Sequence, residues 1–144
     1  MPALAVERGR ETLMAERSGT TEALDLVLAD LRALSEDIES CAVLSGDQDL
    51  LSSSHTSAVD RERAGALLSA LVNLSDRVAR ESGKNHASQL RIDAGDGHLL
   101  LVRLEGGGVL AATTGPEARV GLVLYDMRNS RGEVEKVLAK GSDE

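Results

Sequence analysis

The apolar positions of residues 57–82 follow the three- and four-residue spacing of an α-helix. They are Ala64, Leu67, Leu68, Leu71, Val72, Leu74, Val78 and Ala79. This stripe is wider than one sheet face requires, so the helix needs two apolar neighbours. A sheet of the same chain supplies one, and the same helix of a second copy, across a two-fold axis, is the simplest source of the other. The pattern therefore predicts a long helix and a symmetric dimer.

Two further segments have helical periodicity. Residues 21–39 carry the clearest stripe in the chain, formed by Leu24, Val27, Leu28, Leu31, Leu34 and Ile38. Residues 117–140 carry an interrupted stripe, and residues 129–132 within it predict a kink. Gly121 lies inside this last helix, where glycine costs about 1 kcal/mol relative to alanine. We expect a close packing contact with the sheet to explain it.

Five short segments have the composition of β-strands. They are residues 41–45, 50–54, 89–94, 97–105 and 108–114. The residues between them are rich in glycine and aspartate, as hairpin turns require. In residues 89–94 apolar Leu90, Ile92 and Ala94 alternate with polar residues, which predicts a half-buried strand. Residues 97–105 are largely apolar on both faces, which predicts a central strand with layers on both sides.

The order of these elements predicts an α+β layer fold around one antiparallel sheet of five strands. A length of 144 residues suits a single domain, which we place at residues 20–140. Residues 1–19 are predicted to be an N-terminal extension, flexible or loosely helical, because they show no clean stripe. Residues 141–144 are predicted to be a polar tail.

Composition and charge remove several classes of partner. The chain has one Tyr and no Trp or Phe, so it lacks the aromatic platforms of single-stranded nucleic-acid binders. Sixteen basic against 24 acidic residues give a net charge of −8, which disfavours nucleic acid and anionic membrane surfaces. The single cysteine, Cys41, excludes an intramolecular disulfide, and a reducing cytoplasm is the expected compartment. We expect neither a secretory signal nor a membrane span, since no apolar run is long enough.

Three sequence features resemble catalytic or metal-binding arrangements. Asp47 and Asp49 lie on the first hairpin turn, but the glycine and distant glutamate of a calcium loop do not follow them. Three serines at residues 52–54 precede His55, yet neighbours along a strand point to opposite faces and make no nucleophile and base pair. The histidines lack metal-ligand spacing and carboxylate partners on one helical face. They are His55, His86 and His98. We therefore expect no metal, no cofactor and no enzymatic activity.

The Gly83-Lys84 pair does not belong to a nucleotide-binding loop. Such a loop needs a glycine five residues before Gly83 and a serine or threonine after Lys84. Those positions hold Val78 and Asn85. Gly83 is instead predicted to end the long helix.

Two stretches carry a family resemblance. The first is CAVLSGDQDLLSSS at residues 41–54, followed by the long helix. The second is LLLVRLEGGGVLAATTGPEARVGLVLYDMR at residues 99–128, with Gly115-Pro116 and Gly121-Leu122 near the start of the last helix. With these features, residues 23–138 resemble the Roadblock/dynein light chain family, whose bacterial members include regulators of small Ras-like GTPases. One departure is Asp47-Gln48-Asp49 in the first hairpin, where family members often have an Asp-Gly turn.

The resemblance implies a specific architecture. The long second helix covers one face of the five-stranded sheet, and the first and last helices cover the other. In family homodimers the long helices pack together and the third strands pair edge to edge, giving one continuous ten-stranded sheet. Carried over to this chain, that arrangement places six apolar residues at or near the two-fold axis. They are Leu67, Leu71, Leu74, Val78, Leu90 and Ile92.

The resemblance also implies a function. It predicts a noncatalytic cytoplasmic homodimer that binds a small Ras-like GTPase on a separate chain and modulates its nucleotide state or GTP hydrolysis. Stimulation by ordering the switch loops is favoured over donation of an arginine finger. The long helix offers candidate fingers at Arg61, Arg63, Arg77 and Arg80. The alternative is a dimeric scaffold or adaptor without effect on nucleotide turnover, and its partner binding would not depend on the nucleotide.

Overall fold

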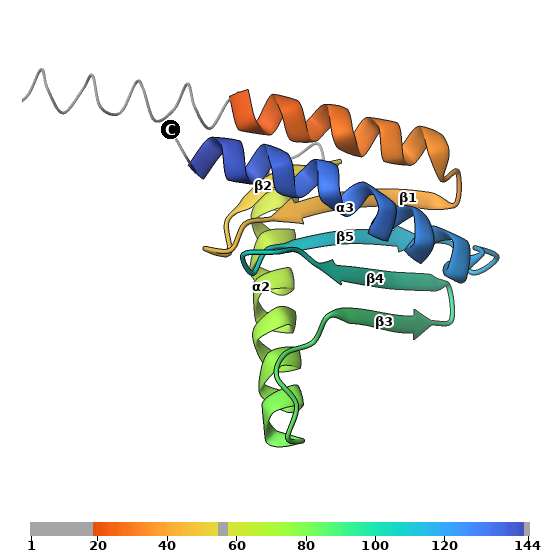
Figure 1. The fold of residues 1–144 in the computed structure, drawn as a ribbon. Helices are drawn as coiled ribbons and strands as arrows, with labels where there is room; N and C mark the ends of the chain where they lie inside the picture. Colours follow the sequence, from red (N-terminus) through yellow and green to blue (C-terminus); the bar gives the residue numbers. More distant parts are fainter. Residues whose placement is uncertain (1–18, 55–57, 143–144) are drawn as a thin grey trace, which may run out of the picture.

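The computed structural model describes residues 19–54 and 58–142, which form a helix-covered antiparallel sheet (Figure 1). A helix at residues 19–34, here called the N-terminal helix, precedes the labelled elements. These are β1 (Ile38–Leu44), β2 (Leu50–Ser53), α2 (Ala58–Glu81), β3 (Gln89–Ala94), β4 (Gly97–Arg103), β5 (Val109–Thr114) and α3 (Val120–Ser142). The strand order is β2-β1-β5-β4-β3, and every neighbouring pair is antiparallel. The predicted α+β fold is confirmed.

The sheet separates two apolar clusters because side chains alternate between its faces. On one face the N-terminal helix and α3 lie side by side and bury the larger cluster (Figure 1). Its fully buried members include Leu24, Leu31, Val43, Leu100, Leu110, Val123, Met127 and Val134. On the other face α2 buries the smaller cluster, formed by Ala42, Leu44, Leu68, Val72, Leu101, Val109 and Ala111. The sheet is therefore covered on both faces, as the apolar pattern of β4 predicted.

Helix α2 crosses the strands and continues past β3, the edge strand of the sheet (Figure 1). The helix ends as predicted at Gly83, which has a φ of +79°. The Lys84 N–H donates to the Ala79 carbonyl at 2.8 Å, and the Gly83 N–H donates to the Arg80 carbonyl at 3.0 Å. This pair of bonds is a Schellman motif, whose left-handed residue is usually glycine. The chain can thus reverse sharply and return to β3.

Three details of the predicted helices are wrong. The N-terminal helix ends at residue 34 instead of 39, because Ile38 is a buried residue of β1 whose four-residue distance from Leu34 mimicked helical periodicity. Helix α3 begins at Val120 instead of residue 117 and is continuous to Ser142, so the kink at residues 129–132 stays a prediction. No heavy atom of another described element lies within 4 Å of a Cβ placed on Gly121, so the expected close contact with the sheet does not exist. The extension predicted at residues 1–19 lies, apart from residue 19, outside the described residues.

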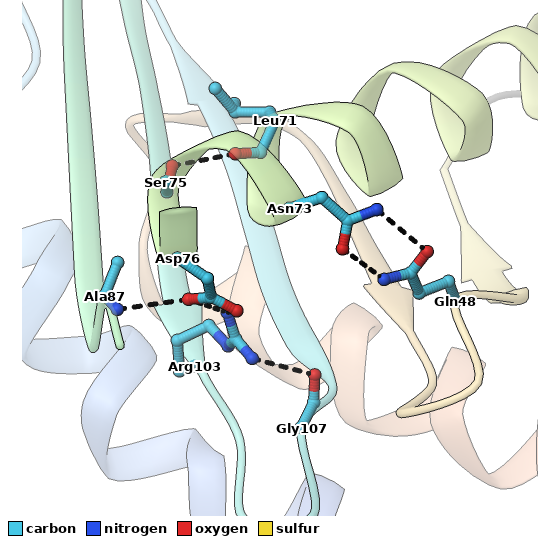
Figure 2. Close-up of polar contacts among 8 residues, drawn as sticks. All are labelled: Gln48, Leu71, Asn73, Ser75, Asp76, Ala87, Arg103 and Gly107. Carbon is cyan, nitrogen blue, oxygen red and sulfur yellow. Dashed lines mark hydrogen bonds and ion pairs between the residues drawn. The ribbon is translucent and has the colours of Figure 1, made fainter. Parts of the chain in front are cut away.

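The β1–β2 turn has an unusual residue at its tip. Gln48 has a φ of +69°, a left-handed conformation that costs a non-glycine residue roughly 1–2 kcal/mol. Its side chain is tied to α2 (Figure 2). Gln48 Nε2 donates to Asn73 Oδ1 at 2.6 Å, Asn73 Nδ2 donates back to Gln48 Oε1 at 3.3 Å, and the Ser69 hydroxyl donates to the same oxygen. These bonds to α2 offset the cost of the backbone conformation.

Replacing Gln48 by alanine and by glycine separates the two effects. Gln48→Ala is expected to lower the free energy of unfolding by about 1 kcal/mol, because it loses the side-chain bonds and keeps the backbone cost. Gln48→Gly loses the same bonds but removes the backbone cost, so its stability should stay near that of the unaltered protein. Urea denaturation measures both. Equal destabilisation in the two variants would contradict a role for the backbone conformation.

Candidate functional site

The candidate functional site is an uncovered apolar surface beside α2 and β3. On α2, Leu68 and Val72 are buried against the sheet, whereas Leu67, Leu74 and Val78 are 65%, 59% and 57% exposed. These three residues are spaced seven and then four residues apart, so they form one stripe along the helix. Exposed leucines and valines in a single stripe mark an interaction surface more often than a solvated one.

The sheet extends this apolar surface beyond the helix. Ile92 of β3 faces Leu99 of β4 in the strand register, and Leu90 faces Leu101. Leu101 belongs to the cluster beneath α2, so alternation puts Ile92 and Leu99 on the same face of the sheet as α2. Ile92 is 40% exposed. The α2 side of the sheet is therefore only partly covered near its β3 edge.

Strand β3 is itself an open edge. It pairs with β4 on one side and with no described strand on the other. The sequence predicted a half-buried strand, but of its residues only Leu90 is half-buried and the rest are exposed. On the α2 side the helix passes over this edge at an angle and continues beyond it, so it covers only part of β3 (Figure 1). An unpaired edge next to exposed apolar side chains favours pairing with another chain.

Of the six residues predicted near the two-fold axis, Leu67, Leu74, Val78 and Ile92 are exposed in the single chain. Leu71 and Leu90 are half-buried and pack against the smaller apolar cluster. All six belong to α2 or β3. They are therefore grouped around one edge of the molecule, and assigning them to a dimer interface remains a prediction.

An ion pair between α2 and β4 holds this region in place (Figure 2). Arg103 Nη1 donates to both carboxylate oxygens of Asp76 at 2.9 Å, and Arg103 Nη2 donates to the Gly107 carbonyl at 3.3 Å. Asp76 also accepts the Ala87 N–H at 3.1 Å, in the connection from α2 to β3. Both charged side chains are largely buried, with 15% exposure for Arg103 and 16% for Asp76. One carboxylate thus joins the helix, the central sheet and the approach to β3.

The electrostatics of Asp76 reflect two opposing causes. Burial raises the pKa of its carboxyl, but hydrogen bonds from Arg103 and from the Ala87 N–H outweigh burial and hold the pKa below its usual range. Arg103 Nε is buried without a hydrogen-bond partner. The pair is therefore charged at neutral pH and depends on both members. Sequence analysis missed it, although Asp76 follows the sheet-facing residues Leu68 and Val72 at four-residue spacing.

The serine-rich end of β2 forms a polar cavity without a catalytic arrangement among the described residues. The cavity has a volume of about 170 Å³ and lies between the N-terminal helix and the β1–β2 edge. The Ser52 hydroxyl donates to Asp25, and the Ser54 hydroxyl accepts the Cys41 N–H at 3.0 Å. Burial raises the pKa of the Cys41 thiol to about 11, so this thiol is not a nucleophile at neutral pH. His55 lies outside the described residues.

The other candidate residues are dispersed over the surface. Asp47 and Asp49 are exposed on the first turn, and within residues 19–54 and 58–142 no group of histidine, cysteine and acidic residues is arranged to hold a metal. His86 is exposed, while His98 contacts Asp93. Of the candidate arginine fingers on α2, three are exposed and one, Arg61, is half-buried. No helix in the described part of the chain combines the length and apolarity that a membrane crossing needs.

Comparison with known proteins links this geometry to a family. The Roadblock/LC7 domain model matches residues 24–114. An uncharacterised protein of Methanocaldococcus jannaschii is 29% identical over 112 residues, which is 78% of this chain and 96% of that protein. The residues matched by the family model include α2, β3 and the strands that α2 covers.

Solved structures share the same fold. A Roadblock/LC7 domain from Streptomyces avermitilis has a TM-score of 0.61 at 30% identity, covering 76% of this chain and 96% of that domain. MglB of Myxococcus xanthus has a TM-score of 0.74 at 16% identity, covering 84% of this chain and 91% of MglB. The two matches therefore cover almost the whole length of both solved proteins.

Proposed function

Because this chain belongs to the Roadblock/LC7 domain family, we propose that it is a noncatalytic homodimer that regulates a small Ras-like GTPase. The family match carries the proposal, since bacterial members of the family include regulators of such GTPases. The chain's only Gly-Lys pair lacks the context of a nucleotide-binding loop, so the GTPase is a separate chain. The dimer modulates the nucleotide state of this partner or its GTP hydrolysis.

The exposed apolar surface supports the homodimer. A two-fold axis beside β3 lets the α2 helices of two copies cover each other's stripes, formed by Leu67, Leu74 and Val78. The same operation pairs the two β3 edges and extends the sheet across the axis. Figure 1 shows that α2 continues past β3. In the proposed dimer this part of the helix lies over the sheet of the second copy. One symmetric contact thus buries the apolar stripe of α2 and the uncovered sheet face, and it pairs the open edge of β3.

The outward side of α2 stays free in this dimer and is the surface that we assign to the GTPase. It carries exposed Arg63, Arg77 and Arg80, and none of them has an ion pair within the described residues. Two rigid helices side by side order the switch loops of a GTPase by contact. Donation of an arginine to the transition state is the alternative way to stimulate hydrolysis.

A nucleotide-dependent binding experiment tests the proposal. The tagged protein is incubated with lysate of the source organism and either a nonhydrolysable GTP analogue or GDP, and bound chains are identified by mass spectrometry. We expect one small Ras-like GTPase to be recovered preferentially with one nucleotide, and the purified pair to show an altered rate of GTP hydrolysis or exchange. Equal recovery with both nucleotides, with unchanged turnover, would instead identify a scaffold.

The same turnover assay separates the two modes of stimulation. An arginine finger contributes about 10³-fold or more to the hydrolysis rate, and lysine does not replace it. We expect Arg63→Ala, Arg77→Ala and Arg80→Ala each to reduce stimulated hydrolysis by less than about tenfold, because ordering of switch loops is shared among many contacts. A loss of about 10³-fold in one variant would identify that residue as a finger.

A further inference from the structure

The face of β3 opposite to α2 carries one basic and one acidic residue, two positions apart. Gln89, Arg91 and Asp93 alternate with the apolar residues of the strand and point to the α3 side of the sheet. Arg128 of α3 donates to Gln89 Oε1 at 2.9 Å, which confirms this orientation. Arg91 Nε donates to Asp93 Oδ1 at 2.7 Å, and His98 Nδ1 lies 2.7 Å from the same oxygen.

These contacts keep the charges fixed at the strand edge. Hydrogen bonds from Arg91 and then from His98 hold the pKa of Asp93 below its usual range, so the carboxylate is charged at neutral pH. The side chains of Arg91 and Asp93 are 47% and 55% exposed, so both remain accessible at the edge strand of the single chain. A strand that pairs with β3 therefore meets one positive and one negative charge, two residues apart.

Symmetry limits how a second β3 can pair with this one. Facing residues of an antiparallel pair share a face of the sheet, and a shift of one residue would move the apolar residues to the wrong face. When two identical strands are related by a two-fold axis, the axis must therefore pass through a residue position, where that residue faces its own copy. An axis between two positions is excluded. The axes that use the middle of β3 pass through Arg91, Ile92 or Asp93.

Charge distinguishes these three registers. With the axis at Arg91, the two Arg91 side chains face each other, and with the axis at Asp93, the two Asp93 side chains do so. Like charges directly opposite each other destabilise a strand pair. With the axis at Ile92, Arg91 faces the partner's Asp93 twice, Ile92 faces its own copy, and Leu90 faces the partner's Ala94. Only this register combines opposite charges on one face with an apolar centre on the other.

We propose that β3 pairs with β3 of a second copy with the two-fold axis at Ile92, so that Arg91 and Asp93 select both the register and the identical chain as partner. This inference rests on the proposed homodimer and adds its geometry. A different Roadblock-type chain that lacks a basic and an acidic residue at these two positions cannot form both ion pairs with this β3. The pair thus favours self-association over mixed pairing.

Disulfide trapping tests the register directly. Facing residues of antiparallel strands have Cα atoms about 4.5–5.5 Å apart, within the range of a disulfide. We expect Ile92→Cys to form a cross-linked dimer under mild oxidation, and Arg91→Cys and Asp93→Cys to cross-link only when the two variants are mixed. Native Cys41 is buried and serves as the control without cross-linking. Cross-linking of Arg91→Cys or Asp93→Cys with itself would overturn the register.

Charge variants test the selection. Arg91→Glu gives β3 two acidic residues and Asp93→Arg gives it two basic ones. We expect each variant alone to dimerise at least tenfold more weakly, and an equal mixture to form a heterodimer with the affinity of the unaltered protein, as measured by analytical ultracentrifugation. An axis at Arg91 predicts instead that Asp93→Arg still dimerises normally, because Asp93 then faces Gln89. An unaltered protein that is monomeric would contradict the proposed dimer itself, whereas a dimer with another cross-linking pattern would contradict only the register.

Discussion

Replacing Leu74 with glutamate is expected to convert the dimer into a folded monomer. The side chain is 59% exposed in the single chain, so the substitution leaves both apolar clusters intact. In the proposed dimer the carboxylate would be buried twice, once for each copy, beside the apolar stripe of the facing helix. Burial of unpaired charges costs several kcal/mol, so the dissociation constant should rise by about 100-fold or more.

Sedimentation measures this change in mass, and circular dichroism shows whether the monomer keeps its fold. Leu26→Glu is the matched control, since Leu26 is 69% exposed on a helix at the opposite face of the sheet. It should leave the mass unchanged. Leu71→Glu is a poorer test, because Leu71 packs on the cluster under α2 and its loss would affect folding as well. An unchanged dimer mass for Leu74→Glu would contradict the placement of this stripe at the interface.

The helix and strand pattern predicted most of the fold because the buried positions are periodic. The stripe of α2 and the two apolar faces of β4 were both read from spacing, and the structure puts a layer on each side of that strand. The predicted end of the N-terminal helix was wrong because it also relied on periodic spacing. Ile38 continues the helical spacing, but its burial comes from the sheet, where its register partner is Thr114.

Contacts between distant residues were not predictable from spacing. Asp76 and Arg103 are 27 positions apart, and only the crossing of α2 over β4 brings them together. The sequence did contain a sign of this contact. Asp76 is a charged residue on the otherwise apolar sheet side of α2, and Arg103 is a charged residue in the largely apolar β4. The left-handed Gln48 gave no signal, because the bonds that support its conformation come from α2. For the candidate site, the sequence identified the apolar residues, and the structure shows which of them are exposed.

Removing Arg103 is expected to have the largest effect on stability. Arg103→Ala leaves the largely buried Asp76 carboxylate with the Ala87 N–H as its remaining hydrogen-bond donor among the described residues. Breaking a buried pair by removing one member costs about 3–5 kcal/mol, a large share of the 5–15 kcal/mol that typical domains have. Urea denaturation should show this loss. Arg131→Ala is the control, because the Arg131–Glu135 pair has a 3.8 Å separation on the surface and should contribute less than about 0.5 kcal/mol.

The pH dependence of this loss tests its electrostatic cause. In the unaltered protein the folded pKa of Asp76 lies below its usual value of about 4, so its stabilising effect is present above pH 4 and is lost as the pH falls further. In Arg103→Ala, burial without the guanidinium should raise the folded pKa, so protonation in acid relieves the unpaired charge. The difference in unfolding free energy between the two proteins should therefore narrow from pH 7 to pH 3. A constant difference would show that Arg103 stabilises the fold through packing of its side chain instead of through its charge.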